Sequence, residues 1–464
     1  MKRAALALTF ALLALAGGAS AFSGASGHGA RALHQTFDAP LTSTPTCSGD
    51  GSTAWTFTRA DAATCASYIN STGLMAFAPK NEARFDYDPV TLKALGYLSE
   101  GSRTNNVLAS TGQPGRAPWS QARLLPDGGG SAIIAPDGTS TTTYIAIEST
   151  ANGLHAWWQN ISHTNGTKGT LSFFVKGAGR TNLCTEIYNT NDPSGILQFF
   201  GASGTGFVGS AGAATGTSFW STAVSTAEAP LGWTRCVVTT GTGTGHTTAI
   251  LRFDIAKADG TTLPSYAGDG SSSIYIWGVQ WEDNATFASS FIGPTTTTAL
   301  TRAADVLTYS SATNVPLAGG TAMLTGDMGC LGTDAAHFLS TRTSSPTENG
   351  LLLFNNSSLT NFAFQVRSGG TVTAIIYTGA RAIGAPYRYA GTWGSGLGSI
   401  YVNGLPGSVG TETGSPSTQN TSLFIGCSFA SAGHIFGHIR DLRIWNVALT
   451  AREIATINAA LGTP

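Results

Sequence analysis

The chain has few charged residues and little basic character. Asp, Glu, Lys and Arg make up 11% of its 464 residues, whereas an ordinary globular domain carries about 25%. The formal net charge is -1, and the only basic run is Lys2-Arg3. Because binding to phosphates requires clustered Lys and Arg, the composition argues against a nucleic-acid partner.

The chain is rich in glycine, threonine and serine. The chain contains 59 Gly, with abundant Thr and Ser, and threonine favours strands. Short β-branched or aromatic runs alternate with Gly, Asn, Asp and Thr clusters, as at residues 171–176, 234–239, 249–253 and 273–281. This rhythm predicts antiparallel strands. We expect an all-β protein with two antiparallel β-sandwich (jelly-roll) domains in tandem, after a cleavable signal-like segment.

The amino terminus has the pattern of a secretory signal. Lys2-Arg3 precedes an apolar run at residues 4–16, and an A-x-A cleavage pattern ends at Ala21. The apolar run is short for a bilayer span, and the alternative is a hydrophobic anchor retained over residues 1–21. Residues 22–35 are rich in Gly, Ser and Ala and are expected to form a flexible lead-in. The segment predicts an exported protein that is extracellular or at the cell surface.

The cysteine count agrees with export. Each of the two expected domains has an even number of cysteines, four in the first and two in the second, which suits disulfides in an oxidising compartment. We predict a bridge between Cys47 and Cys65, and the alternative is that each cysteine is a small buried hydrophobe. The disulfide candidates are Cys47, Cys65, Cys184, Cys236, Cys330 and Cys427.

A series of motifs in the first two thirds of the chain resembles a bacteriophage tail-fibre or head-spike module. The motifs are RFDYDP at 84–89, LGYLSEGSRTN at 95–105, LSFFVKG at 171–177, GWTRC at 232–236, IWGVQ at 276–280, and SFIGP at 290–294 running into TRAADV at 301–306. The resemblance covers about residues 36–306. It implies a jelly-roll architecture that binds carbohydrate on phage particles or on prophage-derived surface proteins. The signal-like segment departs from this pattern, because virion components are usually assembled without export.

The last third resembles a laminin G-like, concanavalin A-like lectin domain. The segment YRYAGTW at 387–393 leads to YVNG at 401–404, and RIWNVAL at 443–449 is followed by TAREI at 450–454. The family has a short helix after its last strand, and here Thr450 with Glu453 can form a capping box. Asn403-Gly404 suits a tight hairpin. We expect this domain over residues 316–464, with a linker at 307–315.

The sequence has few candidate catalytic or metal-binding residues. His434 and His438 are four residues apart, but in a strand this spacing covers about 13 Å, too far for one zinc ion. The expectation is therefore no metal site and no catalytic residues. Asp327 and Asp334 could ligate calcium, as in some lectin sandwiches, but their spacing is uninformative.

The aromatic residues are the remaining binding candidates, because sugar rings stack on Trp and Tyr. Residues 275, 277, 279 and 281 should share one apolar face of a strand, which favours core positions for Trp277 and Trp281. If residues 156–160 form a strand, its successive side chains point to opposite faces, so Trp157 and Trp158 cannot enter the same core. The carbohydrate-binding candidates are Trp157, Trp158, Gln159, Asn160 and Trp220.

Together these features predict a non-enzymatic surface or fibre protein that recognises cell-surface polysaccharides or other glycans. The first alternative is a structural tail or head spike located in the virion, whose sandwiches serve homo-oligomerisation and contact other virion proteins. The second alternative is a glycan-cleaving enzyme with a carboxylate pair that the sequence does not reveal.

Overall fold

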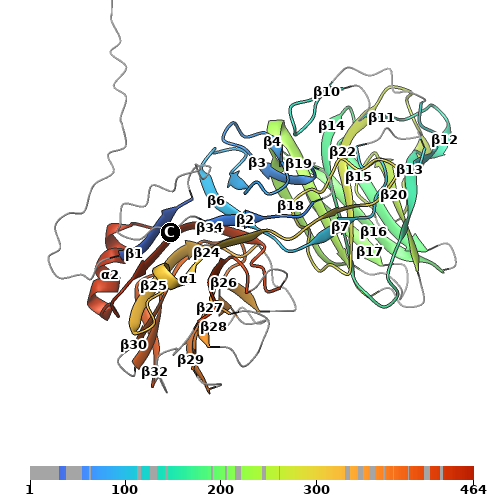
Figure 1. The fold of residues 1–464 in the computed structure, drawn as a ribbon. Helices are drawn as coiled ribbons and strands as arrows, with labels where there is room; N and C mark the ends of the chain where they lie inside the picture. Colours follow the sequence, from blue (N-terminus) through green and yellow to red (C-terminus); the bar gives the residue numbers. More distant parts are fainter. Residues whose placement is uncertain are drawn as a thin grey trace, which may run out of the picture.

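The computed structural model describes residues 31–37, 55–61, 64–111, 117–125, 133–141, 145–189, 192–203, 206–214, 221–242, 247–260, 262–329, 335–342, 349–355, 361–368, 371–379, 381–394, 397–411, 419–428 and 432–464. It confirms an all-β protein with two β-sandwiches side by side (Figure 1). The predicted signal, residues 1–21, lies outside the described residues. No helix in the described part is long and apolar enough to cross a membrane.

The first sandwich consists of a five-stranded and a six-stranded sheet. The five-stranded sheet has the order β11 (Ile145–Ile147), β22 (Ser273–Asp283), β14 (Gly169–Ala178), β19 (Trp233–Thr240) and β18 (Ser221–Ala229). The six-stranded sheet has the order β17 (Gly206–Ala214), β16 (Asp192–Ser203), β15 (Asn182–Asn189), β20 (Thr248–Ala256), β13 (Ala156–Ser162) and β8 (Ser120–Ala122). Their inner faces bury a common core that includes Leu171, Phe173, Phe200, Leu251 and Phe253.

The second sandwich contains strands from both ends of the chain. Its eight-stranded sheet has the order β32 (Leu405–Thr411), β31 (Leu397–Val402), β30 (Tyr387–Gly394), β25 (Gly319–Gly326), β34 (Gly437–Trp445), β6 (Ala94–Ser99) and β5 (Phe85–Tyr87), with β1 (Arg31–Thr36) also paired to β34. Its seven-stranded sheet has the order β2 (Thr56–Thr58), β24 (Val306–Ser310), β33 (Ser422–Ile425), β26 (Ala336–Ser340), β27 (Gly350–Asn355), β28 (Asn361–Ser368) and β29 (Thr371–Thr378).

Four two-stranded pairs and two helices complete the described elements. The pairs are β3 (Ala66–Ile69) with β4 (Met75–Ala78), β7 (Arg103–Asn105) with β23 (Leu300–Arg302), β9 (Ile133–Ile134) with β10 (Ser140–Thr141), and β12 (Asn152–Leu154) with β21 (Ser265–Ala267). The helices are α1 (Ser311–Asn314) and α2 (Ala451–Ala460), and a 3-10 turn spans Pro230–Gly232.

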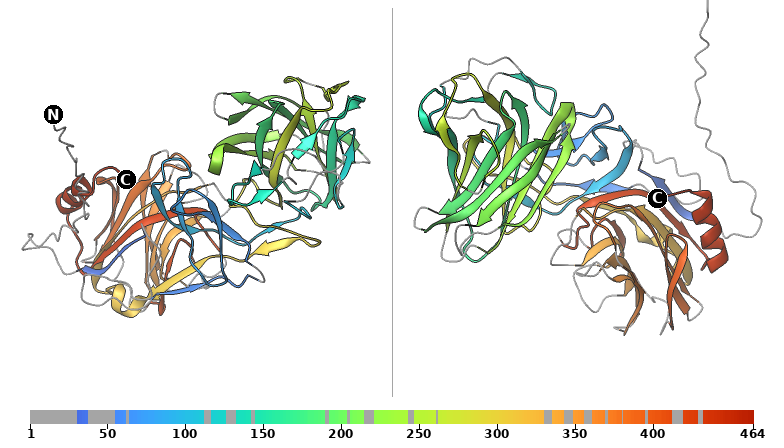
Figure 2. Two further views of the ribbon diagram at one scale, coloured as in Figure 1. Left: turned by 90° about the horizontal axis from the view of Figure 1, so that it is seen from above. Right: turned by 180° about the vertical axis from the view of Figure 1, so that it is seen from behind.

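The first sandwich is therefore inserted between strands of the second. In Figure 2 the blue amino-terminal strands lie with the orange and red carboxyl-terminal ones, and the green sandwich lies apart. Leu33, Phe57, Tyr97 and Leu307 belong to the core cluster of the second sandwich. The sequence placed residues 31–35 in a lead-in and 307–315 in a linker. The structure instead forms β1 over Arg31–Thr36 and most of β24 and all of α1 within 307–315.

A bulge in β22 changes the face on which one tryptophan lies. The pairing of β14 with β22 shifts register between Ser172 and Phe174, and Gly278 has a φ of 62°. A bulge adds one residue and reverses the alternation of side chains beyond it. Trp281 accordingly lies in the core between the sheets, whereas Trp277 packs on the opposite face with Phe174 and Phe291. Both are buried, as predicted, but the predicted common face is wrong.

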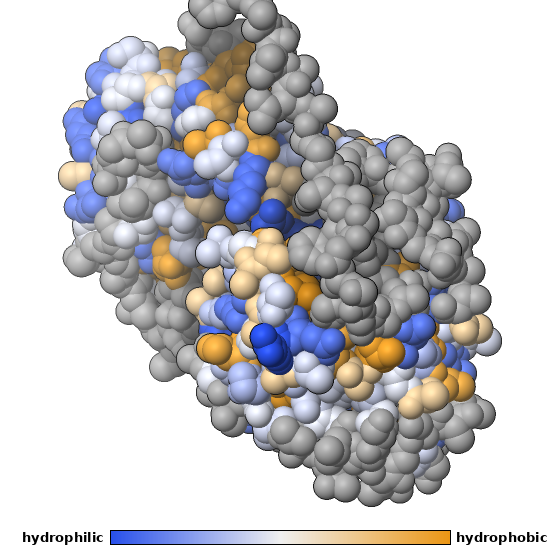
Figure 3. Space-filling view, turned by 90° about the vertical axis from the view of Figure 1, so that its left-hand side faces the viewer, coloured by the Kyte–Doolittle hydropathy of each residue, from blue (hydrophilic) through white to orange (hydrophobic). Residues whose placement is uncertain are grey.

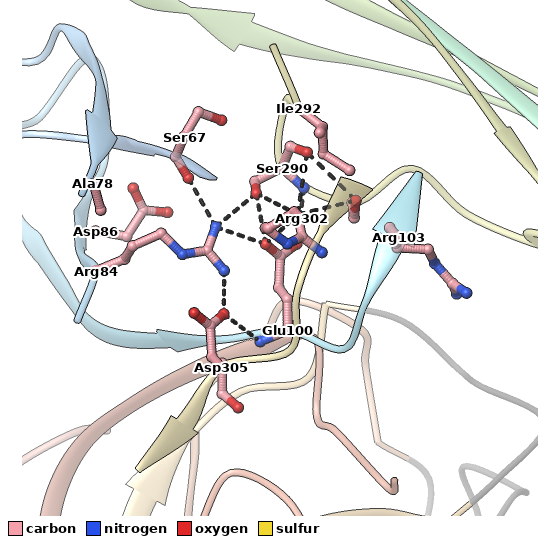
Figure 4. Close-up of polar contacts among 12 residues, drawn as sticks. Ser67, Ala78, Arg84, Asp86, Glu100, Arg103, Ser290, Ile292, Arg302 and Asp305 are labelled. Atoms are coloured by element: carbon pink, nitrogen blue, oxygen red, sulfur yellow. Dashed lines mark hydrogen bonds and ion pairs between the residues drawn. The ribbon is translucent and has the colours of Figure 1, made fainter. Parts of the chain in front are cut away.

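A buried ion-pair network lies where the chain passes between the sandwiches (Figure 4). The Arg84 guanidinium binds Asp305 and lies 2.8 Å from Glu100 Oε2, and Arg302 Nη1 lies 2.9 Å from the same carboxylate oxygen. These side chains are at most 5% exposed. Burial opposes ionisation of Glu100, but Arg302 and Arg84 hold its pKa well below its usual range. The charges of these side chains therefore compensate one another, although the Nε atoms of Arg84 and Arg302 have no hydrogen-bond partner.

The surface of the second sandwich is mixed in character. Seen from the side of that sandwich, polar and apolar residues are interspersed over the described surface (Figure 3). Exposed apolar side chains such as Val90 and Leu405 come from separate loops or strand ends. Scattered exposed hydrophobic residues of this kind are ordinary for a folded protein.

Candidate functional site

The strand expected around Trp157 and Trp158 is β13, and it separates the two indoles. Trp157 is 1% exposed and stacks on Phe253 in the core, with ring centroids 5.4 Å apart. Trp158 is half-buried on the opposite face of the six-stranded sheet. We call that face, on β13, β20 and β15, the outer face. The prediction that only one indole enters this core is confirmed, and Trp158 is the one that stays outside it.

The polar neighbours of the pair have different positions. Gln159 is 3% exposed, and its side-chain amide accepts from Leu108 N at 2.7 Å and donates to Leu108 O at 2.8 Å. Both ends of this amide are occupied, so Gln159 holds a neighbouring segment and is not available to a ligand. Asn160 is exposed on the same strand face as Trp158. Trp220 lies outside the described residues.

Strand pairing brings further side chains to the outer face that the sequence did not single out. Trp158 is opposite Arg252 on β20, which is opposite Glu186 on β15. Asn160 is opposite Ile250, which is opposite Tyr188. Directly opposed residues share a sheet face at about 5 Å. The face therefore presents aromatic, amide and charged groups in adjacent rows.

Arg252 links the polar groups of this face. Its Nε donates to Asp254 Oδ2 at 2.9 Å, and its Nη1 lies 3.0 Å from Glu186 Oε2 without the angles of a hydrogen bond. The guanidinium also lies over the Tyr188 ring, 5.7 Å from its centroid. Buried polar atoms without a hydrogen-bond partner remain at Glu186 Oε2, Arg252 Nη2 and Asp254 Oδ1. Such atoms are usually satisfied by water or a ligand.

The two acids of the outer face ionise with difficulty. Burial raises the pKa of Glu186 to about 7 against the opposing charge of Arg252. Burial likewise raises the pKa of Asp254 to about 6, again opposed by Arg252. Near neutral pH this face therefore holds acids that can change protonation, next to one fixed cation.

The four cysteines in the described part carry free, buried thiols: Cys65, Cys184, Cys236 and Cys427. Cys184 packs with Leu197 and Phe199 outside the main core, whereas Cys236 lies within the core between the sheets. A Cys184–Cys236 bridge is therefore not formed, because the two thiols belong to different clusters. Cys65 is likewise free, so the predicted bridge between Cys47 and Cys65 is not formed. Cys47 and Cys330 themselves lie outside the described residues.

Asp327, the calcium candidate, is paired with a histidine. His438 Nδ1 lies 3.0 Å from Asp327 Oδ2, and its Nε2 lies 3.0 Å from Asp86 Oδ2. Although burial opposes the charge, Asp327 and Asp86 raise the pKa of His438 to about 10. Asp334 lies outside the described residues. Within the described ranges no group of three or more His, Cys, Asp or Glu is arranged to hold a metal ion.

Comparison with known proteins supports the assignment of the carboxyl-terminal domain. Residues 328–455 match the family model described as the concanavalin A-like lectin/glucanases superfamily, a laminin G type. No curated protein matches the chain. The predicted concanavalin A-like domain is thus confirmed over this range, while the resemblance of residues 36–306 to a phage fibre module stays a prediction.

Several solved structures align with about a third of the chain. The sialidase module CBM40 of Ruminococcus gnavus, bound to α2,3-sialyllactose, is 11% identical, with 31% of this chain and 83% of that chain covered and a TM-score of 0.28. Domain 4 of the arabinanase AbnA from Geobacillus stearothermophilus, in complex with arabinotriose, is 18% identical, with coverages of 33% and 73% and a TM-score of 0.29. A pentraxin from Limulus polyphemus is 16% identical, with coverages of 31% and 70% and a TM-score of 0.24.

Proposed function

We propose that this protein is an exported, non-enzymatic carbohydrate-binding protein of a surface or fibre, which recognises cell-surface glycans. The outer face of the first sandwich is the proposed binding face. The observation that carries the proposal is the position of Trp158, half-buried on that face in one row with Arg252 and Glu186.

The chemistry of the outer face suits a sugar. A pyranose presents a flat C–H face that can stack on the Trp158 indole, and its hydroxyls can bond to amide and charged groups. Asn160 is exposed beside the indole, and Arg252 and the two acids retain unpaired polar atoms.

The concanavalin A-like domain gives independent support. Residues 328–455 match a superfamily that includes lectins, so two sandwich modules could contribute sugar contacts in one chain. The same superfamily also includes glucanases.

The acidic pair of the outer face favours binding over glycan cleavage. Glycosidases place two carboxyl groups about 5 to 9.5 Å apart on opposite sides of an open position for the scissile bond. Here Arg252 is bound to Asp254 and paired with Glu186, so a cation stands between the two carboxyl groups. The arrangement leaves no open position between an acid and a base at this place.

Replacement of Trp158 by Ala tests the proposal. Stacking of one pyranose contributes on the order of 1 kcal/mol, or about fivefold in affinity, and several linked copies would multiply the effect. We expect Trp158→Ala to bind a bacterial polysaccharide array at least about fivefold more weakly, with nearly unchanged thermal stability. Trp158→Phe, the matched control, keeps an aromatic ring and should retain more binding.

Two outcomes would contradict the proposed face. Equal binding by Trp158→Ala and the parent would remove Trp158 from the site. A large loss of thermal stability in Trp158→Ala would show that the indole is a packing residue, as Trp157 is.

A further inference from the structure

A polar cavity lies away from the outer face, near the junction of the two sandwiches. Its volume is about 360 Å³, within the range of about 300 to 1,000 Å³ that is typical of ligand pockets. One wall comes from residues 102–106, in and around β7, and the other from Thr164 and the turn after β22. The side chains used below are Ser102, Arg103, Thr104, Thr164, Asp283 and Asn284.

Arg103 is the cation of this cavity, and aromatic rings hold it in place. Its guanidinium carbon lies 5.1 Å from the ring centroid of Phe287 and 5.0 Å from that of Phe436. Phe287 follows β22 of the first sandwich, and Phe436 precedes β34 of the second. The side chain is 23% exposed. Both sandwiches therefore position this guanidinium, and its order depends on their contact.

The hydrogen-bond donors of Arg103 are not used by the described residues. Its Nε is buried and has no hydrogen-bond partner, and Glu282 Oε1, at 3.8 Å, is beyond hydrogen-bond distance. Glu282 instead accepts from Ser289 N, at 2.8 Å, and from Ser289 Oγ. No hydrogen bond joins the Nη atoms of Arg103 to another described residue. In Figure 4 the side chain of Arg103 points away from the Arg84, Glu100 and Asp305 network.

The acid of the cavity is held in its charged form. Asp283 accepts from Thr164 N at 2.8 Å and is 2.8 Å from His163 Nδ1. Burial opposes ionisation, but these contacts lower the pKa of Asp283. A fixed carboxylate that faces the cavity repels an anion placed next to it and accepts hydrogen bonds from hydroxyls. The ligand must therefore place its anionic group on Arg103 and its hydroxyls toward Asp283.

We infer that this cavity binds the carboxylated unit of an acidic glycan, such as a uronic acid. The sugar carboxylate would accept two parallel hydrogen bonds from Arg103, for which a planar guanidinium is suited. The ring hydroxyls would bond to Asp283, Asn284 and the hydroxyl side chains of Ser102 and Thr104. The inference rests on the proposed glycan-binding function and names a second subsite with its own specificity.

Titration calorimetry with small probes tests the cavity. We expect the parent protein to bind D-glucuronate, and to bind D-glucose and acetate at least about tenfold more weakly, since charged hydrogen bonds and hydroxyl contacts act together. Arg103→Gln should reduce glucuronate binding at least about tenfold. Arg103→Lys should recover only part of it, because an ammonium group cannot make the planar pair of bonds.

Two further variants separate binding from folding and from the outer face. Ser102→Trp places a large side chain at an exposed position of the cavity wall, and should block glucuronate without a change in melting temperature. Trp158→Ala should leave glucuronate binding unchanged. If Trp158→Ala loses array binding while the parent does not bind glucuronate, only the inference about the cavity is wrong. If the parent binds glucuronate while Trp158→Ala keeps full array binding, only the proposed outer face is wrong.

Two further outcomes would contradict the acidic-sugar site. Equal affinity for acetate and glucuronate would show a simple anion site and overturn the acidic-sugar assignment. Glucuronate binding that persists in both Arg103→Gln and Ser102→Trp would place the ligand elsewhere.

Discussion

At the scale of single residues, burial of Glu186 makes stability depend on pH. Its pKa is raised from 4.5 to about 7 in the folded protein. Between these values the folded state holds more protons than the unfolded chain, so this group's contribution to stability is lost as the pH rises through about 7. Glu186→Gln should remove that contribution.

The measurement is urea unfolding of parent and variant between pH 4 and pH 8. We expect the difference in unfolding free energy between parent and Glu186→Gln to shift in favour of the variant as the pH rises. Glu82→Gln, at an exposed acid outside the outer face, is the control and should run parallel to the parent. A constant difference between Glu186→Gln and the parent would show that Glu186 ionises normally.

The alternation of side chains along β13 reveals only part of the arrangement around Trp157 and Trp158. Alternation alone predicted that Trp157 and Trp158 lie on opposite faces, because it is a property of any strand. It did not reveal which of the two is buried, or that Gln159 bonds Leu108. Arg252 and Glu186 had no local signal, since they become neighbours of Trp158 only through pairing between β13, β20 and β15.

At the scale of elements, helix α2 has the capping box that the sequence predicted. Thr450 accepts from Glu453 N, and Glu453 Oε2 accepts from Thr450 N at 2.7 Å. Ile454 is the buried anchor of the helix on the eight-stranded sheet, where it joins Met323 and Trp445. Local sequence was sufficient here, because all the capping groups lie within one turn.

Removal of this cap should weaken the helix by a measurable amount. Thr450→Ala leaves backbone N–H groups of the first turn unsatisfied, and we expect a loss of about 1 kcal/mol in unfolding free energy. Thr450→Ser keeps the hydroxyl and should retain the stability of the parent, because serine caps helices at least as well as threonine. Chemical denaturation followed by circular dichroism measures both, and equal stability of the Ala variant and the parent would show that packing alone fixes the helix.

In strand β22, unlike helix α2, the local sequence was not sufficient to predict the arrangement. The alternation of residues 275 to 281 predicted one apolar face, but the bulge at Gly278 turns Trp277 to the other face. Both faces of this strand are covered, by the main core and by the cluster around Phe291. A strand that is apolar on both sides carries no periodic signal of where its register shifts.

At the scale of the whole molecule, the second sandwich needs the amino-terminal strands. Strands β1, β5 and β6 extend its eight-stranded sheet, and β2 and β24 form the edge of the other. Leu33, Phe57, Tyr97 and Leu307 fill its core. Deletion of these elements would expose the edges of both sheets and open the core between them.

A fragment of residues 316–464 alone should therefore not fold cooperatively. We expect it to lack the sharp thermal transition of residues 31–464, measured by calorimetry, and to aggregate through its exposed strand edges. The matched control is the same fragment joined by a short linker to residues 31–99, which should regain part of the transition. A fragment 316–464 as stable as the full chain would show that the added strands are dispensable.

The sequence by itself determined the all-β class, the last helix with its cap and the approximate place of the lectin domain, because strand propensity, capping and motif order are local properties. The tertiary structure decided which strands share a sheet, and so it placed β1, β2, β5 and β6 in the second sandwich. It also assembled the outer face and the Arg103 cavity from segments far apart in the chain. Contacts of this kind depend on long-range pairing, which no local pattern records.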